Sequence, residues 1–413
     1  MIMSRRVVVT GIGVTSPIGN SVAESVAALR EGRHGVRFMP EWGHISDLQG
    51  RLGATVEGLD LKTLYPRKKR RTMGKVAMFA VHSTEQAVEQ SGLDKETLES
   101  ERTGVAFGST SGSGSETEAF STPLALHKTM KGLESNSYFR LMTHTCAVNV
   151  GHFYRVRGRI VPMCTACTSG SQGIGTGYEL IREGHQDVML CGGAEEMHYT
   201  TAVTFDLLMA TSTKYNERPD GAPRPFDASR DGLVIGEGAG AVVLESYEHA
   251  AARGADILAE VLGYASNCDG AHLTMPSQDG MRRVMELSLQ AAGLSPDDVD
   301  YVNGHGTGTE IGDITESRAT RELFGRAVPY STQKGYVGHT LGACGAMETA
   351  WTIEMMRNGW IAPCRNLEEL DSRCGELDYV REPREAKLGI VMKNNFAFGG
   401  INTSILLGPP PTS

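Results

Sequence analysis

Four short segments of the chain hold side chains that could do chemistry. The first reads Met-Cys-Thr-Ala-Cys-Thr-Ser-Gly over residues 163–170 and precedes a predicted helix over 172–182. At a helix start, unpaired backbone N–H groups and the positive end of the dipole stabilise a thiolate, so we predict a lowered pKa and a nucleophilic role for Cys167. The adjacent N–H groups could also hold an oxyanion formed on a thioester carbonyl. A buried structural cysteine is the competing interpretation, and it applies equally to Cys344, which lies in a similar segment.

Two histidines lie next to glycines. His305 follows a predicted strand in the sequence Asn-Gly-His-Gly-Thr-Gly-Thr, where the glycines would let a substrate approach the ring closely. In the same loop, Thr307 and Thr309 offer hydroxyls to an amide-bearing ligand. His339 stands after a glycine in Lys-Gly-Tyr-Val-Gly-His-Thr. A single loop histidine is usually a surface or hydrogen-bonded residue, so neither histidine identifies a site alone.

A lysine, a glutamate and two phenylalanines complete the set. Lys334 lies shortly before His339, and Glu348 lies on the predicted helix that follows. A buried lysine needs a carboxylate partner, so these two could pair, although such a pair could be purely structural. Phe396 and Phe398 precede two glycines and could line an apolar channel, although paired aromatics are also common in cores.

The combination of these groups is more informative than any one of them. A decarboxylating Claisen condensation needs a thiolate that carries an acyl group and donors that stabilise a thioester enolate. It also needs a dry tunnel for the chain. One cysteine, two glycine-flanked histidines and a Phe-Gly-Gly loop meet these requirements.

The elements that must position these residues alternate between strands and helices. Apolar, β-branched or small runs predict strands, and amphipathic runs predict helices. This alternation indicates an α/β fold with a largely buried sheet. The strands are expected at 6–10, 104–108, 187–190, 241–245 and 401–407, and two of the helices at 75–91 and 280–292.

The two halves of the chain repeat each other in two places. A helix ending at Gly92 is followed by an acidic turn and a strand at 105–107, and a helix ending at Gly293 by the same turn and a strand at 301–303. Glycine suits the left-handed residue after a helix. The segment Ala-Cys-Thr-Ser-Gly at 166–170 also resembles Ala-Cys-Gly-Ala at 343–346. Although α/β proteins are repetitive in general, two repeats in the same order predict two related halves joined near 250–258.

Bulk composition narrows the class of protein. A chain of 413 residues is too long for one simple core. Its net charge of −9, from 40 basic and 49 acidic side chains, argues against binding of nucleic acid or anionic lipid. Eight scattered cysteines form no zinc pattern and suggest a reducing compartment, so we expect no metal site. Apolar runs are too short for a signal peptide or membrane insertion, which predicts a cytoplasmic protein.

Longer motifs connect the chain to a known family. It carries STKYN at 212–216, PFD at 225–227, RDG at 230–232, GEG at 236–238 and IAP at 361–363. With these, the chain resembles the elongating β-ketoacyl-[acyl carrier protein] synthases, types I and II, of bacterial fatty acid synthesis and related type II polyketide systems. The resemblance extends from Val7 to Asn402. It implies a thiolase-like five-layer αβαβα sandwich of two duplicated halves, 1–252 and 253–413, paired into a dimer.

The resemblance also implies roles for individual residues. Cys167 would be the nucleophile, His305 and His339 would stabilise the enolate, and Lys334 with Glu348 would be the active-site lysine and its acidic partner. The remaining implied positions are the Cys167 and Phe398 backbone N–H groups as oxyanion hole, Phe398 with Phe396 as gate, Thr307 and Thr309 at the phosphopantetheine arm, and Ser111 near the end of the acyl pocket.

The implied reaction has two half-reactions. An acyl group moves from its carrier protein to the cysteine, and malonyl-carrier protein then loses carbon dioxide to form the enolate that attacks it. No cofactor is expected beyond the phosphopantetheine of the carrier. Carrier proteins in such systems are acidic, so the basic run at 67–71 is a predicted docking site. Its expected contacts are Arg67, Lys68 and Arg71, which align with docking residues of type I members, with Lys128 and Lys131 as an extension.

Several departures from the family pattern affect the predicted substrate. Leu233 replaces a usual phenylalanine, Val337 replaces a threonine, and the histidine loop reads Gly-Thr-Gly-Thr-Glu rather than Gly-Thr-Ser-Thr-Pro. They leave the chemistry intact, but a polyene or polyketide route stands beside fatty acid synthesis. In such a route the chain could be the catalytic subunit of a heterodimer with a chain-length factor. Acyl length and saturation are left open.

Other members of the same superfamily are less consistent with the sequence. A thiolase lacks the two-histidine pattern, and initiating synthases replace one histidine by asparagine, so His339 and Lys334 argue against both. A non-catalytic chain-length or scaffold subunit would have lost the nucleophile, which is present here as Cys167.

Overall fold

The computed structural model describes residues 4–411 and contains one continuous sheet of eleven strands. The sheet has two parts, which meet where β1 pairs with β9 over three residues, Val7 to Val9 against Val261 to Ala259. The first part has the order β5 (Ile160–Met163), β4 (Thr103–Gly108), β6 (Val188–Glu195), β8 (Gly238–Ser246), β1 (Val7–Thr15). The second has the order β13 (Asp378–Tyr379), β11 (Pro329–Ser331), β10 (Tyr301–Asn303), β15 (Val391–Ala397), β16 (Ile401–Gly408), β9 (Ala259–Cys268).

Both parts of the sheet have the same topology. Leaving out the edge strand β13, the strands of each part lie in the order third, second, fourth, fifth and first along the chain. In each part the first three of these are parallel, as β5, β4 and β6 are, and the last two are antiparallel to their neighbours. The pairings of β11, β10, β15, β16 and β9 repeat this pattern. The predicted duplication of the fold is therefore confirmed.

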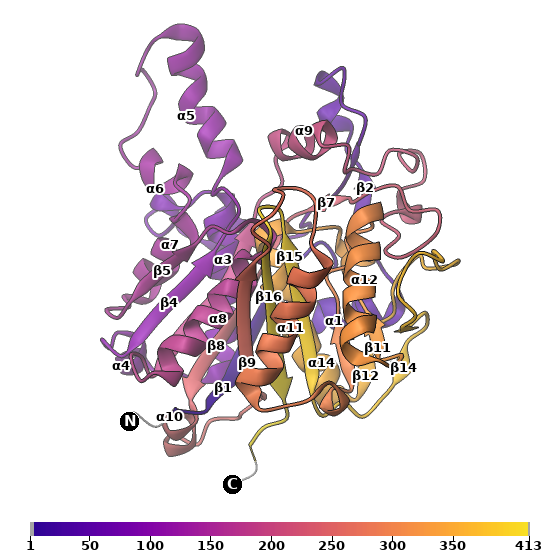
Figure 1. Ribbon diagram of the computed structural model, residues 1–413. Helices are drawn as coiled ribbons and strands as arrows, with labels where there is room; N and C mark the ends of the chain where they lie inside the picture. The colour runs from indigo at the N-terminus through magenta and orange to yellow at the C-terminus, as the bar shows by residue number, and fades with distance from the viewer. Residues whose placement is uncertain (1–3, 412–413) are drawn as a thin grey trace.

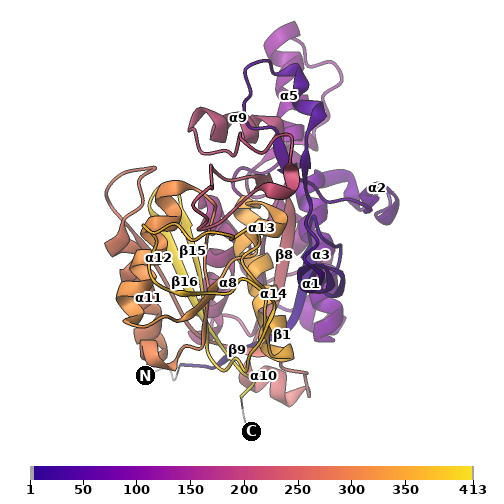
Figure 2. The ribbon, with the colours of Figure 1, turned by 90° about the vertical axis from the view of Figure 1, so that its right-hand side faces the viewer.

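Helices on both faces of each part complete five layers, as Figure 2 shows from the side. The central layer contains α8 (Ser169–Arg182) and α14 (Cys344–Asn358), which contact strands of both parts of the sheet. One outer layer holds α3 (Lys75–Ser91) and α7 (Thr145–Tyr154), and the other holds α11 (Gln278–Ala292) and α12 (Glu310–Phe324). The thiolase-like αβαβα sandwich predicted from the sequence is thus present.

Small residues let the central helices lie deep between the sheet layers. A Cβ atom on Gly173 of α8 would lie 2.7 Å from the Ala106 carbonyl oxygen and 2.8 Å from that of Gly192. On Gly170, a Cβ would lie 2.9 Å from the carbonyl oxygen of Gly342, at the start of α14. Side chains at these positions would push α8 away from β4, β6 and α14, because protein interiors are close-packed.

The starts of the two central helices are equivalent, but not in the register that the sequence repeat indicated. Each begins with a short 3-10 turn, η3 (Ala166–Thr168) before α8 and η6 (Leu341–Ala343) before α14. Both turns open with a non-glycine residue at positive φ, Ala166 at 48° and Leu341 at 47°. This register pairs Cys167 with Gly342 rather than with Cys344, so the predicted pairing of the two cysteine segments was wrong by two positions.

The predicted helix ends agree well with the structure. The helix expected at 75–91 is α3, and the glycines that follow α3 and α11 have φ values of 65° and 67°, as left-handed caps require. The predicted strands are all present, although β1, β6 and β8 extend further than expected. The join expected near 250–258 falls between α10 (Tyr247–Ala252) and β9.

Part of the remaining structure lies at the upper end of the sheet in Figure 1, away from the chain termini. There α5 (Gly114–His127), which has no buried residue, projects from the body with α6 (Ser137–Leu141) at its base. In the part of the chain that is described, no helix is both long and apolar enough to cross a membrane. The other elements are α1 (Val22–Glu31), β2 (Val36–Phe38), η1 (Pro40–His44), β3 (Leu52–Ala54), α2 (Leu61–Leu64), η2 (Arg70–Thr72), α4 (Lys95–Leu98), α9 (Tyr199–Leu207), η4 (Pro219–Gly221), β7 (Ile235–Gly236), η5 (Pro296–Asp298), α13 (Lys334–Val337), β12 (Trp360–Ile361) and β14 (Arg384–Glu385).

Candidate active site

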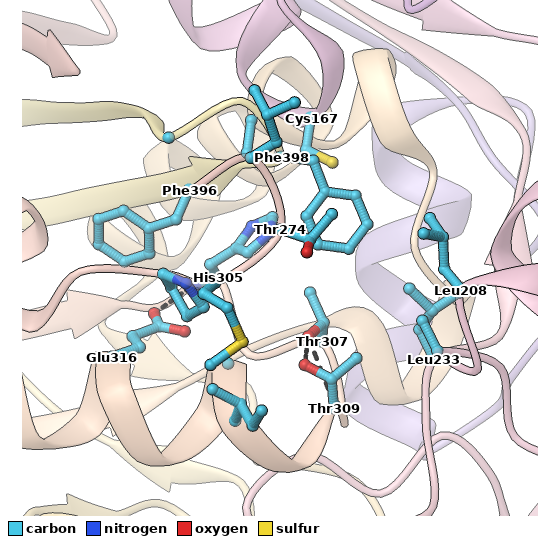
Figure 3. Close-up of a pocket in the computed structure, with 18 of the residues that line it drawn as sticks. Cys167, Leu208, Leu233, Thr274, His305, Thr307, Thr309, Glu316, Phe396 and Phe398 are labelled. Atoms are coloured by element: carbon cyan, nitrogen blue, oxygen red, sulfur yellow. Dashed lines mark hydrogen bonds between the residues drawn. The ribbon is translucent and has the colours of Figure 1, made fainter. Parts of the chain in front are cut away.

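A cavity of about 360 Å³ lies where the carboxyl ends of strands from both halves meet. Cys167 comes from the turn after β5, His305 from the loop after β10, and Phe398 from the turn after β15. Figure 3 shows these three side chains around one space, with Thr307 and Thr309 on the wall away from Cys167. In open α/β sheets such strand ends form the usual ligand site, so the topology brings the predicted groups together.

Cys167 is buried at the entry to α8. The positive φ of Ala166 makes a sharp turn before it, and its Sγ lies 3.0 Å from Nε2 of His339. Burial, together with Glu195, raises the pKa of the Cys167 thiol to about 12, although Lys334 and the N–H groups of Cys167 and Phe398 oppose the rise. The lowered thiol pKa predicted from the helix start was therefore wrong, because desolvation of a buried thiolate costs more than these groups recover.

The backbone around Cys167 provides the donors that an oxyanion needs. The N–H groups of Cys167 and Phe398 both act on the sulfur, since each lowers its pKa. They converge from the two halves of the chain, one from the start of α8 and the other from the turn after β15. A thioester carbonyl bound at this sulfur would have its oxygen within reach of both donors.

The two histidines are neutral and present the same tautomer. Burial, with Lys334 nearby, holds the pKa of His305 and of His339 well below the usual value. His339 Nδ1 accepts from the Leu341 N–H at 3.3 Å, and His305 Nδ1 accepts from the Asn395 side-chain amide at 3.1 Å. A neutral imidazole has one N–H, so both rings carry it on Nε2. The rings stand nearly perpendicular with centroids 5.0 Å apart.

A cysteine and two histidines at this spacing could also hold a metal ion. One ligand atom from each of Cys167, His305 and His339 lies within 4.8 Å of the others. However, a metal-bound histidine normally donates a hydrogen bond through its other ring nitrogen. Here both Nδ1 atoms accept instead, which leaves Nε2 as a donor. The hydrogen bonds therefore favour stabilisation of an oxyanion over metal binding.

The predicted pairing of Lys334 with Glu348 occurs directly behind the histidines. Lys334 Nζ lies 2.5 Å from Glu348 Oε1, and both side chains are buried. Burial alone would lower the pKa of Lys334, but the Glu348 carboxylate raises it above the usual value. The second carboxylate oxygen, Oε2, binds Lys393 at 2.7 Å, a partner that the sequence interpretation missed.

Glu316 on α12 holds the histidine loop and was also missed. Its Oε1 accepts from the His305 N–H and its Oε2 from the Gly306 N–H, the second at 2.8 Å. Tyr330 donates to Oε1 at 2.6 Å. The two backbone N–H groups that donate to this one side chain fix the position from which the His305 side chain projects. An acidic residue almost two turns into α12 is ordinary in a sequence, so no local signal marked it.

Two glycines at the mouth of the cavity have backbone conformations that favour glycine. Gly399 and Gly400 have φ values of 92° and 72°, which side-chain-bearing residues rarely adopt. Before them, Phe398 is 37% exposed and stacks on Phe205 of α9, with centroids 6.0 Å apart. Phe396 is buried and meets the His305 ring edge-on at 6.2 Å. Phe398 thus stands at the entrance and Phe396 in the wall.

The two predicted threonines lie in the cavity, whereas Ser111 does not line it. The Oγ1 atoms of Thr307 and Thr309 are 2.9 Å apart and face the same space. Ser111 is exposed in the loop after β4. The chain by itself therefore does not use Ser111 as a pocket wall.

The basic residues predicted to dock a partner lie on the surface. Arg67, Lys68 and Arg71 are exposed beside α6, whose preceding residue Asn136 donates to the Arg71 carbonyl at 2.6 Å. Lys128 and Lys131 are exposed just after α5. Within residues 4–411, no carboxylate comes within ion-pairing distance of any of these five cations. Their charge is thus available to a partner.

Comparisons with known proteins agree with this arrangement. The family model described as "Beta-ketoacyl synthase, N-terminal domain" matches residues 4–250, and "Beta-ketoacyl synthase, C-terminal domain" matches 258–368. The 3-oxoacyl-[acyl-carrier-protein] synthase 1 of Haemophilus influenzae is 37% identical over 404 residues, covering 97% of this chain and 98% of that protein.

Two solved structures are similar over nearly their whole length. A β-ketoacyl synthase from Burkholderia phymatum is 50% identical with a TM-score of 0.95, covering 98% of this chain and 100% of that one. The ishigamide ketosynthase/chain length factor is 33% identical with a TM-score of 0.90, covering 99% and 100%.

Proposed function

The chain belongs to the β-ketoacyl synthase family, and we propose that it joins a malonyl-derived unit to an acyl chain held on Cys167. The product is a β-ketoacyl chain, two carbons longer, on acyl carrier protein. One observation carries this proposal. The Cys167 sulfur shares a cavity with two imidazoles whose Nε2 atoms are donors and with two converging backbone N–H groups.

In the first half-reaction, Cys167 takes the acyl group. Its sulfur attacks the thioester carbonyl of the acyl-carrier protein, and the oxyanion lies between the N–H groups of Cys167 and Phe398. The carrier thiol then leaves and takes up the proton that Cys167 loses. Because the thiol is neutral in the resting protein, this proton must leave as the S–C bond forms. The acyl chain remains on Cys167 as a thioester.

In the second half-reaction, malonyl-carrier protein loses carbon dioxide. The electron pair of the broken C–C bond passes to the thioester, and the enolate oxygen accepts hydrogen bonds from Nε2–H of His305 and of His339. The enolate carbon attacks the acyl carbonyl on Cys167. Collapse of that intermediate breaks the S–C bond, and the freed Cys167 thiolate takes up a proton from solvent. We propose that Thr307 and Thr309, whose side chains line the cavity, contact the amides of the pantetheine arm.

Intact-protein mass spectrometry tests this assignment. Wild type incubated with a panel of acyl-carrier proteins should gain one acyl mass, and Cys167→Ala should gain none. Cys344→Ala, which changes the other buried thiol in the site, should still be acylated. His305→Ala and His339→Ala should acylate but should lose release of carbon dioxide from malonyl-carrier protein by about 100-fold or more. Equal loss of both half-reactions in the histidine variants would contradict the division of roles.

The preferred acyl group in the same panel assigns the pathway. Saturated fatty acyl chains would place the enzyme in fatty acid synthesis, and unsaturated or polyketide chains would place it in a specialised route. We propose no cofactor beyond the phosphopantetheine of the carrier. All eight cysteines are free thiols, which agrees with a cytoplasmic, reducing location.

We propose that two copies pair through β5. This strand ends the sheet, and its backbone is paired on one side only, with β4. It is apolar, and the large side chain of Ile160 on it is exposed. An unpaired apolar edge strand tends to associate with another strand unless it is covered.

We place the boundary between the halves after residue 252, at the end of α10.

Light scattering of the purified protein measures the oligomeric state. We expect twice the mass of the chain, and we expect Ile160→Lys to shift the population toward single chains. Leu64→Lys, which changes an exposed leucine on α2, controls for the effect of a surface lysine. A wild-type protein that is monomeric alone and binds a chain-length factor would instead support the heterodimer.

A further inference from the structure

Two polar residues inside β15 lie directly behind His305. We propose that Lys393 and Asn395 are positioning residues that hold His305 with Nδ1 as acceptor, so that its Nε2–H points at the enolate oxygen. The proposal rests on the proposed function and adds to it the device that sets the His305 tautomer. Lys393 and Asn395 are two apart on one strand, so both side chains face α14, while Asn394 faces α11.

Lys393 has all of its donors satisfied although it is fully buried. Its Nζ lies 2.7 Å from Glu348 Oε2, 2.6 Å from the Asn394 carbonyl oxygen and 2.8 Å from Asn395 Oδ1. An ammonium has three N–H donors and no acceptor. The three contacts therefore use the full capacity of the group, and each neighbouring atom must accept.

This donor-only contact fixes which way the Asn395 amide points. Its Oδ1 accepts from Lys393 Nζ and also from the Ser171 hydroxyl, which lies 2.5 Å away on α8. Its Nδ2 then faces Glu348 Oε2 at 3.2 Å and His305 Nδ1 at 3.1 Å. Turning the amide over would set an N–H2 group against an ammonium. The orientation follows from the network of hydrogen bonds rather than from the amide alone.

The oriented amide determines the tautomer of His305. Because Nδ2 donates, the ring nitrogen it meets must accept, and the single proton of the neutral ring moves to Nε2. Within residues 4–411, Asn395 is the hydrogen-bond partner of His305 Nδ1, while Lys334 Nζ bonds to Glu348 instead. His305 thus depends on Asn395, and Asn395 depends on Lys393.

The charges around His305 agree with a neutral ring. Lys334 on α13, Lys393 on β15 and His339 all act to lower its pKa, after burial as the largest cause. Two buried ammonium groups share the single Glu348 carboxylate, one on each oxygen. Glu316 on α12 bonds the backbone N–H of His305 rather than its ring. The surroundings therefore oppose a second proton on the imidazole.

The side chains around Asn395 are closely packed, and a glycine at 345 leaves the space that the hydrogen-bond network occupies. A Cβ atom on Gly345 of α14 would lie 2.1 Å from the Ser171 Oγ and 2.9 Å from Asn395 Oδ1. Glycine at 345 therefore allows the Ser171 and Asn395 side chains to meet. Ser171 lies four residues after Cys167, so the same contact ties the amide to the helix that directly follows the proposed nucleophile.

Separate assays of the two half-reactions test the proposal. Asn395→Asp keeps the shape but replaces the N–H2 donor by an acceptor, which would draw the ring proton to Nδ1. We expect carbon dioxide release from malonyl-carrier protein to fall by about 100-fold and acylation of Cys167 to stay within about threefold. Asn394→Leu, on the opposite face of β15, is the control and should keep both half-reactions within about threefold.

Nitrogen NMR of ring-labelled histidine provides a readout that a general loss of packing would not move. His305 signals, assigned by comparison with His305→Ala, should show the Nε2–H form in wild type and the Nδ1–H form in Asn395→Asp. Lys393→Met, which keeps the length of the side chain and removes its charge, should populate both forms and lower carbon dioxide release. Lys393→Arg should restore part of it.

The outcomes separate this proposal from the proposed function. A wild-type protein that neither acylates Cys167 nor releases carbon dioxide overturns the function itself. A wild type that does both, with an Asn395→Asp variant that keeps the Nε2–H form and full decarboxylation, overturns the positioning role alone. Equal losses in acylation and decarboxylation for Asn395→Asp and Lys393→Met would also overturn it, because they would indicate damage to the whole site.

Discussion

Cys167 combines a reactive position with a neutral thiol. Its backbone is held in a sharp turn at a helix start, yet burial outweighs the stabilising groups and raises its pKa to about 12. A thiolate is the reactive form of cysteine, so the resting protein keeps its nucleophile nearly inactive toward water-borne electrophiles. The thiol proton must therefore leave when the substrate is bound and reacts.

This state predicts a distinctive pH dependence of alkylation. Between pH 7 and pH 9 the thiolate fraction of a group with so high a pKa rises about tenfold per pH unit. The rate of modification of Cys167 by iodoacetamide should rise in the same proportion, as measured by peptide mass spectrometry. The exposed Cys268 in the same samples reports on access of the reagent. A plateau for Cys167 below pH 8 would mean that the helix start dominates after all.

For single residues, the sequence identified the side chains of the site better than it predicted their protonation states. Glycine neighbours and spacing marked Cys167, His305 and His339, and the structure places all three in one cavity. Lys393 was missed because it lies before the predicted Phe-Gly-Gly loop, although a lysine inside a buried strand is itself unusual. The prediction of a lowered pKa for the Cys167 thiol was wrong because this pKa depends on burial by segments far away in the sequence.

Helices and strands in this fold depend on close approach between layers. Gly240 on β8 illustrates this, because a Cβ atom there would lie 2.3 Å from the Met347 backbone nitrogen on α14. The contact is with backbone, so neither side chain rotation nor a small shift of one residue can relieve it. The central helix layer would have to move relative to the first part of the sheet.

Gly240→Ala should therefore destabilise the protein. We expect a loss of about 1–3 kcal/mol in the free energy of unfolding, the usual cost of overpacking, measured by denaturant titration. Gly43→Ala is the matched control, because a Cβ there meets only the Arg51 guanidinium at 4.0 Å. Its free energy of unfolding should change by less than about 0.5 kcal/mol. Equal stability for both variants would show that the layers can separate without cost.

Element prediction succeeded where periodicity is strong and failed where it is absent. The helices α3 and α11 were found because their side chains alternate between core and solvent. The strands were found because they are short, continuous runs of apolar, β-branched or small residues, which are buried on both faces of the sheet. The register of the repeat between α8 and α14 was wrong, since small residues on both helices allow several alignments. The segment 197–237 and the loop 268–277 around the cavity mouth have no period that a sequence pattern could show.

At the scale of the whole molecule, charge is distributed unevenly. The chain carries a net charge of −9, yet Arg67, Lys68 and Arg71 stand exposed, and among residues 4–411 no carboxylate pairs with them. The net negative charge of the protein repels acidic partners in general. The local basic patch attracts an acidic partner that approaches it directly. An acidic carrier protein would be steered to this patch.

Reversal of one of these charges should weaken the carrier-dependent reaction. For Lys68→Glu we expect kcat/KM with malonyl-carrier protein to fall by about 3- to 10-fold at low salt, and the difference to shrink as salt rises. With a malonyl-pantetheine substrate, which lacks the carrier, the variant should equal wild type. Lys95→Glu makes the same change of charge on α4, near the lower end of the molecule in Figure 1, and should change neither rate. A loss with both substrates would place Lys68 elsewhere in the mechanism.

The architecture was predictable at this scale through resemblance more than through physics. Alternation of strands and helices indicates α/β, and the two repeats indicate duplication. The five layers followed only from the family motifs, and the strand order was not predicted, because both depend on contacts between distant segments. The projection of α5 away from the body has no counterpart in the sequence interpretation.

The two equivalent helix starts differ at the position of Cys167. This difference bears on how many acyl groups one copy of the chain can carry. Where η3 has Cys167, η6 has Gly342, whose N–H donates to Glu195 at 3.0 Å. A Cβ atom on Gly342 would lie 2.8 Å from the Thr110 nitrogen and 2.9 Å from a Glu195 oxygen, so this second turn has no space for a thiol. With Cys167 as the proposed acyl carrier, we expect one acyl group per copy of the chain, because the equivalent second turn holds no thiol.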